Sequence, residues 1–117
     1  MSQDSLSGLR DTLRLFASER DWDQFHTPKN LACAVVTEAA ELLAHFRWSD
    51  EGEINKLTPA ERTEVSHEMA DVLLFLVRLA DKLEIDPIEA AHQKLRINAE
   101  RYPIEKAKGS SKKYTEL

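Results

Sequence analysis

Apolar residues recur at intervals of three and four along most of this chain, a spacing that places them on one face of an α-helix. No stretch shows the strict apolar–polar alternation that is typical of a half-buried strand between turns. The pattern therefore predicts an all-α protein. We expect four helices, at about residues 7–20, 28–47, 59–84 and 87–101.

The last three helices begin at the motifs TPKN, TPAE and DPIE, which start at residues 27, 58 and 86. Each motif places a threonine or aspartate, whose side chain can cap a helix, before a proline at the first helical position. In TPAE, Thr58 and Glu61 also have the spacing of a capping box. Pro103 is expected to end the fourth helix.

The predicted fold is a four-helix bundle formed by one domain, residues 1–117. A chain of 117 residues, of which 42% are hydrophobic, can form one modest core. The segment after the fourth helix, PIEKAKGSSKKYTEL, is rich in lysine, glycine and serine. We therefore expect an extended or mobile tail over residues 103–117.

The third helix contains the run VLLFLV, residues 72–77, which is apolar nearly all the way round. A helix of this kind has to be covered on every side. Three other short helices of one chain are too few to cover it. The run therefore predicts a homo-oligomer.

Charge and composition exclude some partners. The formal net charge of -5 argues against a nucleic-acid polymer, because neutralising phosphates requires a basic surface, but not against a single nucleotide. No apolar run is long enough to span a bilayer, and the N-terminal residues do not resemble a signal peptide. The single cysteine, Cys33, excludes an intrachain disulfide and suits a reducing cytoplasm.

The second and third helices each carry an acidic pair beside the apolar stripe. In TEAAELLAHF, residues 37–46, Glu38 lies within about 20° of Leu31 in helical projection, and Glu41 lies at the edge of the same stripe. On the third helix, Glu68 falls within the stripe and Asp71 lies beside it. If the two helices are antiparallel, the pairs lie within about one turn of each other.

Four carboxylates gathered at a core edge repel one another and lose hydration unless cations compensate. Arg47 and Arg78 are the nearest candidate cations, and both can simply face solvent. A set of oxygen ligands without cysteine suits Mg²⁺, or Mn²⁺ in its place. The alternative is that each pair is an ordinary solvated helix face.

Carboxylate-rich bundles also hold di-iron centres through Glu-x-x-His motifs, and Glu64 and His67 have that spacing. However, position 67 projects about 100° away from Glu68, and a second such motif is missing. We therefore favour magnesium. The four histidines share no ligand spacing and are interpreted as surface or structural residues: His26, His45, His67 and His92.

Several segments resemble one known family: ERDWDQFHTPKNL, EAAELLAHFRW, HEMADVLLFLVRLA, KLRINAERYP and SSKKYTEL. They are similar to the MazG-like all-α nucleoside triphosphate pyrophosphohydrolases, and most to the dCTP pyrophosphatase subgroup. The resemblance implies a dimer-of-dimers tetramer that converts a nucleoside triphosphate to the monophosphate and pyrophosphate. It places Mg²⁺ on Glu38, Glu41, Glu68 and Asp71.

The resemblance also implies the substrate-binding residues. Lys94, Asn98 and Tyr102 match the family pattern K-x-x-x-N-x-x-x-Y and form one line along the fourth helix, where they can contact the triphosphate and the sugar. Trp22 and Trp48 are placed at the base, where an indole can stack.

Two positions depart from the subgroup near the base. Leu13 and Phe75 stand where some members have histidine and tyrosine. Hydrogen bonding to the base edge is then left to His26, Asn98, backbone groups or water.

The expected activity is magnesium-dependent hydrolysis of dCTP or a modified dCTP to the monophosphate and pyrophosphate. This activity would remove unwanted nucleotides from the cellular pool. Glu38 or Glu41 would orient or deprotonate the attacking water. The rival substrates are dUTP, another modified pyrimidine nucleotide and phosphoribosyl-ATP. A non-enzymatic helical interaction module, with merely solvated acids, is the alternative from a different class.

Overall fold

The computed structural model describes residues 5–47 and 57–117, and every regular element in these ranges is helical. The all-α class and the four long helices are therefore confirmed. The chain divides into two compact units, residues 1–84 and 85–117. Among the described residues, no helix is long and apolar enough to cross a membrane.

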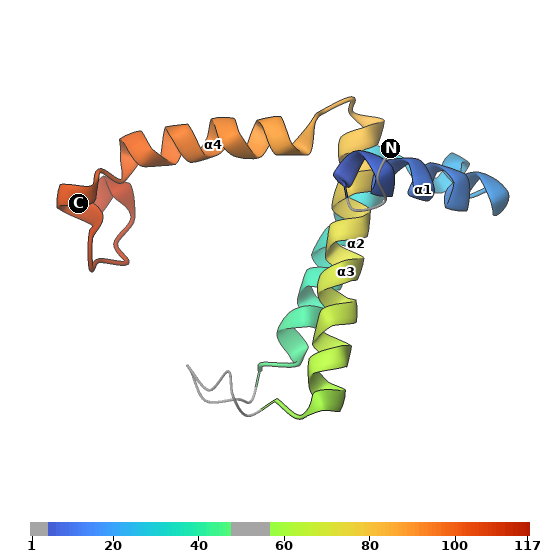
Figure 1. The fold of residues 1–117 in the computed structure, drawn as a ribbon, viewed down its shortest axis with the longest axis horizontal. Helices are drawn as coiled ribbons and strands as arrows, with labels where there is room; N and C mark the ends of the chain where they lie inside the picture. Colours follow the sequence, from blue (N-terminus) through green and yellow to red (C-terminus); the bar gives the residue numbers. More distant parts are fainter. Residues whose placement is uncertain (1–4, 48–56) are drawn as a thin grey trace. The chain divides into compact units, whose positions relative to one another are not determined.

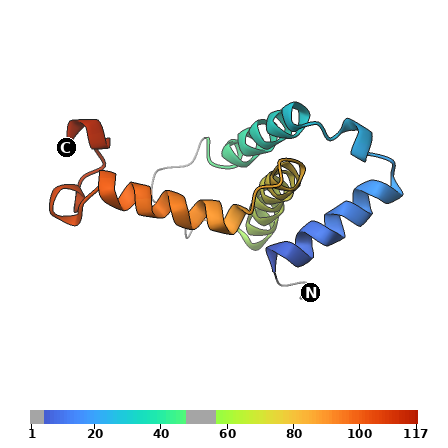
Figure 2. The ribbon, with the colours of Figure 1, turned by 90° about the horizontal axis from the view of Figure 1, so that it is seen from above.

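The first unit is built on a helical hairpin. It contains α1 (Leu6–Glu19), a short 3₁₀ helix η1 (Asp23–Phe25), α2 (Pro28–Ala44) and α3 (Pro59–Lys82). Helices α2 and α3 lie side by side and run antiparallel, as Figures 1 and 2 show, and α1 also packs on α3. The antiparallel arrangement is the condition under which we expected the two acidic pairs to meet.

The helix starts follow the predicted caps. The Thr27 hydroxyl accepts a hydrogen bond from the Asn30 N–H, and Thr58 forms a complete capping box with Glu61. Asp86 caps the fourth helix by accepting from two backbone N–H groups. Helices α1, α2 and α3 end one to three residues earlier than expected, because helix ends fray.

The first unit buries few residues by itself. Its buried apolar side chains are Ala17, Leu31, Val65, Val77 and Ala80. On the apolar run of α3, by contrast, Leu73 is 43% exposed and Leu76 is 46% exposed. Within the described chain, α3 is thus covered on part of its circumference only.

The second unit contains α4 (Pro87–Arg101), the single turn α5 (Ile104–Ala107) and the 3₁₀ turn η3 (Tyr114–Glu116). For the segment after Pro103 we expected an extended or mobile chain, and the structure shows these two short turns joined by residues without regular structure. The Tyr114 ring packs edge-on against Tyr102, with the ring centroids 5.9 Å apart. The Arg101 guanidinium lies 4.8 Å from the Tyr114 ring centre. These contacts bring the end of the chain back onto the end of α4.

Candidate functional site

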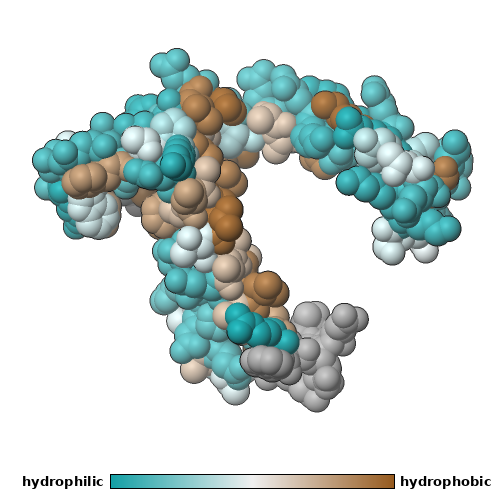
Figure 3. Space-filling view, turned by 180° about the vertical axis from the view of Figure 1, so that it is seen from behind, coloured by the Kyte–Doolittle hydropathy of each residue, from teal (hydrophilic) through white to brown (hydrophobic). Residues whose placement is uncertain are grey.

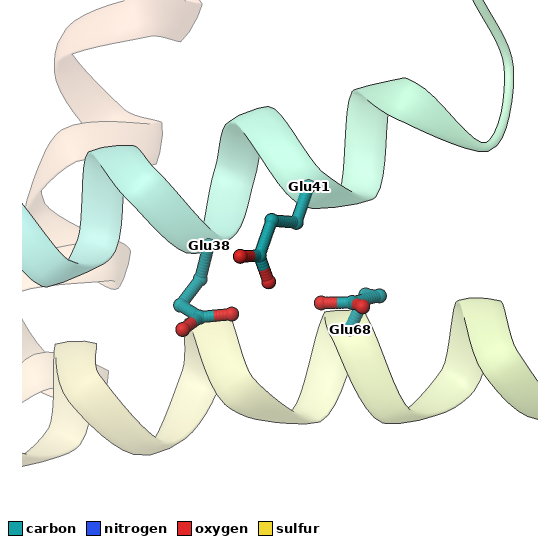
Figure 4. A group of neighbouring side chains, drawn as sticks. All are labelled: Glu38, Glu41 and Glu68. Carbon is teal, nitrogen blue, oxygen red and sulfur yellow. The ribbon is translucent and has the colours of Figure 1, made fainter.

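Three carboxylates meet between α2 and α3. Glu38, Glu41 and Glu68 each offer one carboxylate oxygen, and these oxygens all lie within 4.8 Å of one another. Figure 4 shows Glu38 and Glu41 reaching from α2 toward Glu68 on α3. Glu38 and Glu68 are half-buried, while Glu41 is exposed. The register of the antiparallel helices therefore brings three of the four predicted acids together.

Two carboxylate oxygens of this cluster are buried. Glu38 Oε2 and Glu68 Oε2 are buried and have no hydrogen-bond partner among the described residues. The pKa of the Glu38 carboxyl is raised above its usual value, first because burial removes hydration and then because Glu41 lies against it. The charges of Asp71 and Glu68 raise this pKa further. The site therefore holds more negative charge than the described residues around it compensate.

Asp71 adjoins the cluster without joining it. Its charge acts on Glu38, but its carboxylate lies outside the group of three oxygens that share the 4.8 Å limit. It is half-buried on α3, one turn after Glu68. The fourth predicted acid is thus near the site but not in contact with all its members.

These residues fit a hard divalent cation. The donors are all carboxylate oxygens, and two of them are buried acceptors without a hydrogen bond among residues 5–47 and 57–117. Among the described residues, the basic group of His45 lies near the cluster, with its Nε2 3.8 Å from Glu68 Oε1, beyond hydrogen-bond distance. Within the described ranges, Glu64 and His67 do not belong to this group, which disfavours the di-iron arrangement.

A short aromatic row lies at the end of α1 and in the turn after it. The Trp22 ring packs edge-on against Phe16, at 5.8 Å between centroids, and against His26, at 6.4 Å. Trp22 is 45% exposed, so its ring is accessible beside the partly buried His26. The structure thus brings together two residues that were predicted to contact the base.

Arg78 was missed by the sequence reasoning. We placed it among the cations that can face solvent, but it is only 5% exposed. Its Nε–H donates to His26 Nδ1 at 3.1 Å, and its terminal NH₂ group donates to Asp23 Oδ1 at 2.6 Å. The signal was an arginine within the long apolar stretch of α3, where a charge is buried only if it is paired.

The remaining predicted residues lie elsewhere. Phe75 is half-buried on α3. Lys94 is exposed on α4 of the second unit, and Asn98 and Tyr102 are half-buried there. Trp48 lies outside the described residues.

Comparison with known proteins identifies relatives of this chain. Residues 34–117 match the MazG-like family. The chain is 46% identical over 114 residues to human dCTP pyrophosphatase 1, across 93% of this chain and 67% of the human protein. It is 39% identical over 118 residues to bovine dCTP pyrophosphatase 1, across 99% of this chain and 70% of the bovine protein. A solved pyrophosphatase structure from Archaeoglobus fulgidus has a TM-score of 0.78 and 43% identity, across 83% of this chain and 91% of that one.

The chain therefore belongs to the MazG-like family. Its class is that of the nucleoside triphosphate pyrophosphohydrolases. Enzymes of this family are generally metal-dependent, and the cluster of Glu38, Glu41 and Glu68 is a group able to hold a metal ion.

Proposed function

We propose that this enzyme hydrolyses a deoxypyrimidine triphosphate, with dCTP or a 5-substituted dCTP preferred, to the monophosphate and pyrophosphate. The observation that carries the proposal is the pair of buried, unpartnered oxygens of Glu38 and Glu68 beside Glu41. Relatives named dCTP pyrophosphatase 1 support the choice of substrate. Clearance of unwanted nucleotides from the pool is the cellular role that this activity serves.

Four acids would hold Mg²⁺, or Mn²⁺ in its place: Glu38, Glu41, Glu68 and Asp71. When bound, a divalent cation neutralises charge on phosphate oxygens and makes a water more acidic. Glu38 or Glu41 would orient the attacking water and take its proton. The water oxygen forms a bond to phosphorus, and the bond between the monophosphate and the pyrophosphate breaks. A water proton thus ends on the carboxylate, and the leaving oxygen carries the electron pair.

The base and the phosphates are assigned to separate groups of residues. Trp22 offers an accessible ring for stacking, and each stacked base contributes roughly 1–3 kcal/mol. His26, beside Trp22, is the candidate for a hydrogen bond to the base edge. We keep the remaining assignments from the sequence: Phe75 and Trp48 at the base, and Lys94, Asn98 and Tyr102 at the phosphates and sugar.

A second copy of the chain is the proposed partner. On α3, Met69, Leu73 and Leu76 follow the spacing i, i+4, i+7 and are all exposed. On α2, Val36 and Leu43 are exposed at spacing i, i+7. Figure 3 shows apolar side chains gathered along this hairpin. Contiguous apolar surface of this kind marks an interface, which supports a homo-oligomer, and the dimer of dimers is the form that the sequence resemblance implies.

The cytoplasm is the proposed location. Cys33 is an exposed free thiol on α2, and thiols stay reduced in that compartment. Neither a nucleic-acid polymer nor a membrane is proposed as a partner, because the chain is acidic and carries a cluster of three carboxylates.

The decisive experiment is release of pyrophosphate from a mixture of nucleoside triphosphates, with and without Mg²⁺. Magnesium-dependent release, accompanied by formation of a monophosphate, is expected. Absence of release with every nucleotide would contradict the proposal and favour a helical interaction module. Individual nucleotides, including dUTP and phosphoribosyl-ATP, then identify the substrate.

A further inference from the structure

Arg78 is the one charged residue in the buried class among those the structure describes. Three groups surround its guanidinium. It donates hydrogen bonds to His26 and Asp23, and its NH1 lies 3.6 Å from Asp81 Oδ2. Since α3 carries Arg78 while His26 and Asp23 belong to the turn at η1, the guanidinium joins that turn to α3.

The direction of the bond to His26 determines where the imidazole carries its proton. Arginine nitrogens donate hydrogen bonds and do not accept them, so the bond from Arg78 Nε requires an unprotonated His26 Nδ1. The neutral ring then carries its proton on Nε2. The pKa of His26 is lowered, first by burial and then by the positive charges of Arg78 and Lys82, against the opposing effect of Asp23. The ring therefore stays neutral near pH 7.

A second basic residue holds Asp23 in place. Lys82 Nζ donates to the same Asp23 Oδ1 that accepts from Arg78, at 2.5 Å. Asp23 is thus shared by two cations that lie one turn apart on α3. This sharing restrains the turn at η1, and with it the ring of His26.

The His26 ring lies beside Trp22, the residue proposed to stack on the base. Within residues 5–47 and 57–117, His26 Nε2 has no hydrogen-bond partner, and the ring contacts Trp22 edge-on. Arg78 follows Asp71 by seven residues, so it lies about two turns, or roughly 10 Å, along the same face of α3. The imidazole and the acidic cluster are therefore both anchored to this part of α3.

We propose that Arg78 is a positioning residue that makes His26 a fixed hydrogen-bond donor, through Nε2–H, to an acceptor on the edge of the substrate base. A pyrimidine carbonyl oxygen or an unprotonated ring nitrogen is such an acceptor. With the proton on Nδ1 instead, Nε2 would be an acceptor and would repel the same atoms. This inference rests on the proposed nucleotide substrate. It adds that Arg78 decides whether His26 Nε2 donates or accepts the hydrogen bond to the base.

The first test is made on the free protein by nuclear magnetic resonance. In the wild type at pH 7.5, we expect a scalar coupling across the hydrogen bond between Arg78 Nε and His26 Nδ1, with the ring proton on Nε2. The matched control is Arg14→Met, because Arg14 contacts the same Asp81 but does not contact His26. In that variant the coupling should persist. A wild-type ring protonated on Nδ1, or on both nitrogens, would overturn the proposal.

The second test is kinetic and uses a double-mutant cycle. We expect Arg78→Met to raise KM for the preferred deoxypyrimidine triphosphate about 10-fold, or about 1.4 kcal/mol, with kcat changed far less. In a His26→Ala background, the same substitution should change KM by less than about twofold. Equal effects in both backgrounds would overturn the proposal, because the role of Arg78 would then not pass through His26. If Arg78→Met does not fold, Arg78→Lys, which keeps the charge but loses the planar fork, replaces it in the cycle.

The outcomes separate this inference from the proposed function. Absence of turnover by the wild type would overturn the proposed function, and with it the role of Arg78 toward substrate. Normal turnover with equal effects in both backgrounds would overturn only the role of Arg78. The coupling in the free protein reports on the tautomer in either case.

Discussion

Glu38 on α2 and Glu68 on α3 face each other across the hairpin, and each keeps one buried carboxylate oxygen without a partner among the described residues. An unpaired buried acceptor costs about 1–3 kcal/mol, and more when it is charged. Such an arrangement persists in a folded protein when a ligand or a function requires it. A bound cation would satisfy both oxygens, so the site should lose its activity when an acid is removed and gain stability when the ion binds.

Replacing Glu68 by glutamine should lower turnover at least about 100-fold, because losing even an outer-shell partner of a metal ligand typically costs about 10–100-fold in metal affinity or activity. The metal-free protein should keep its melting temperature or gain a few degrees, since the change relieves repulsion at Glu38. Pyrophosphate release and thermal melting measure the two effects. The matched control is Glu64→Gln, an exposed carboxylate one turn earlier on α3, which should keep its activity. Full activity of Glu68→Gln would remove Glu68 from the mechanism.

Magnesium should stabilise the wild type. A ligand that binds only the folded state adds about 2.7 kcal/mol when its concentration is about 100 times its Kd. Melting curves with increasing MgCl₂ should therefore shift upward for the wild type and much less for Glu38→Gln. Equal shifts in the two proteins would show that the ion binds elsewhere. The same melting curves with calcium or manganese salts show which ion stabilises the protein most.

The ion pair between Arg14 and Asp81 predicts a pH dependence of stability. Arg14 donates to both carboxylate oxygens of Asp81, and this contact lowers the pKa of Asp81 below its ordinary value of 3.8 despite the opposing effect of burial. A lowered folded-state pKa means that the contribution is present above the unfolded value and is lost as the pH falls through the folded value. Asp81→Asn should therefore melt a few degrees below the wild type at pH 7. The difference should shrink below pH 3.8, and a constant difference down to pH 3 would contradict this account.

The exposed stripe on α2 and α3 predicts that assembly depends on apolar contact. Leu73→Glu should shift the protein toward monomers in sedimentation velocity at micromolar concentration, because a charge would enter the interface. Leu73→Met, which keeps the volume and the apolar character, should preserve the assembly. A stable wild-type monomer at the same concentration would contradict the proposed oligomer.

Base selection is tested by comparing kcat/KM for the four deoxynucleoside triphosphates and 5-methyl-dCTP. We expect dCTP or 5-methyl-dCTP to exceed dTTP by about 10-fold, or about 1.4 kcal/mol. Stacking on Trp22 does not distinguish the bases, so the preference depends on hydrogen bonds to the base edge. Purine nucleotides should be poor substrates. Equal efficiency with dATP would contradict the base assignment while leaving the metal site untouched.

The sequence by itself determined the helices and their starts. The threonine and aspartate caps and the prolines at residues 28, 59 and 87 act within one turn, so they can be read without knowledge of the fold. The same holds for the acidic pairs, because spacing i, i+3 on a helix fixes their common side. Helical periodicity also placed Glu38 and Glu68 beside apolar stripes, which is where the structure has them.

Only the tertiary structure decided which side chains meet. The register of α2 against α3 brings Glu38, Glu41 and Glu68 within 4.8 Å and leaves Asp71 just outside that group. The predicted helix ends fixed this register only to within about one turn, since the register is set by packing between segments far apart in the chain. The return of Tyr114 onto Tyr102 was likewise decided by contacts that no local pattern encodes.

Arg78 shows the difference most directly. Its position on α3 was readable from the sequence, but its burial depends on Asp23 and His26, which lie 55 and 52 residues away in the chain. A charged side chain can enter the interior only where such partners are brought to it by the fold. The sequence therefore determined the helices and the acidic residues, whereas the tertiary structure decided that a buried arginine sets the proton position on His26.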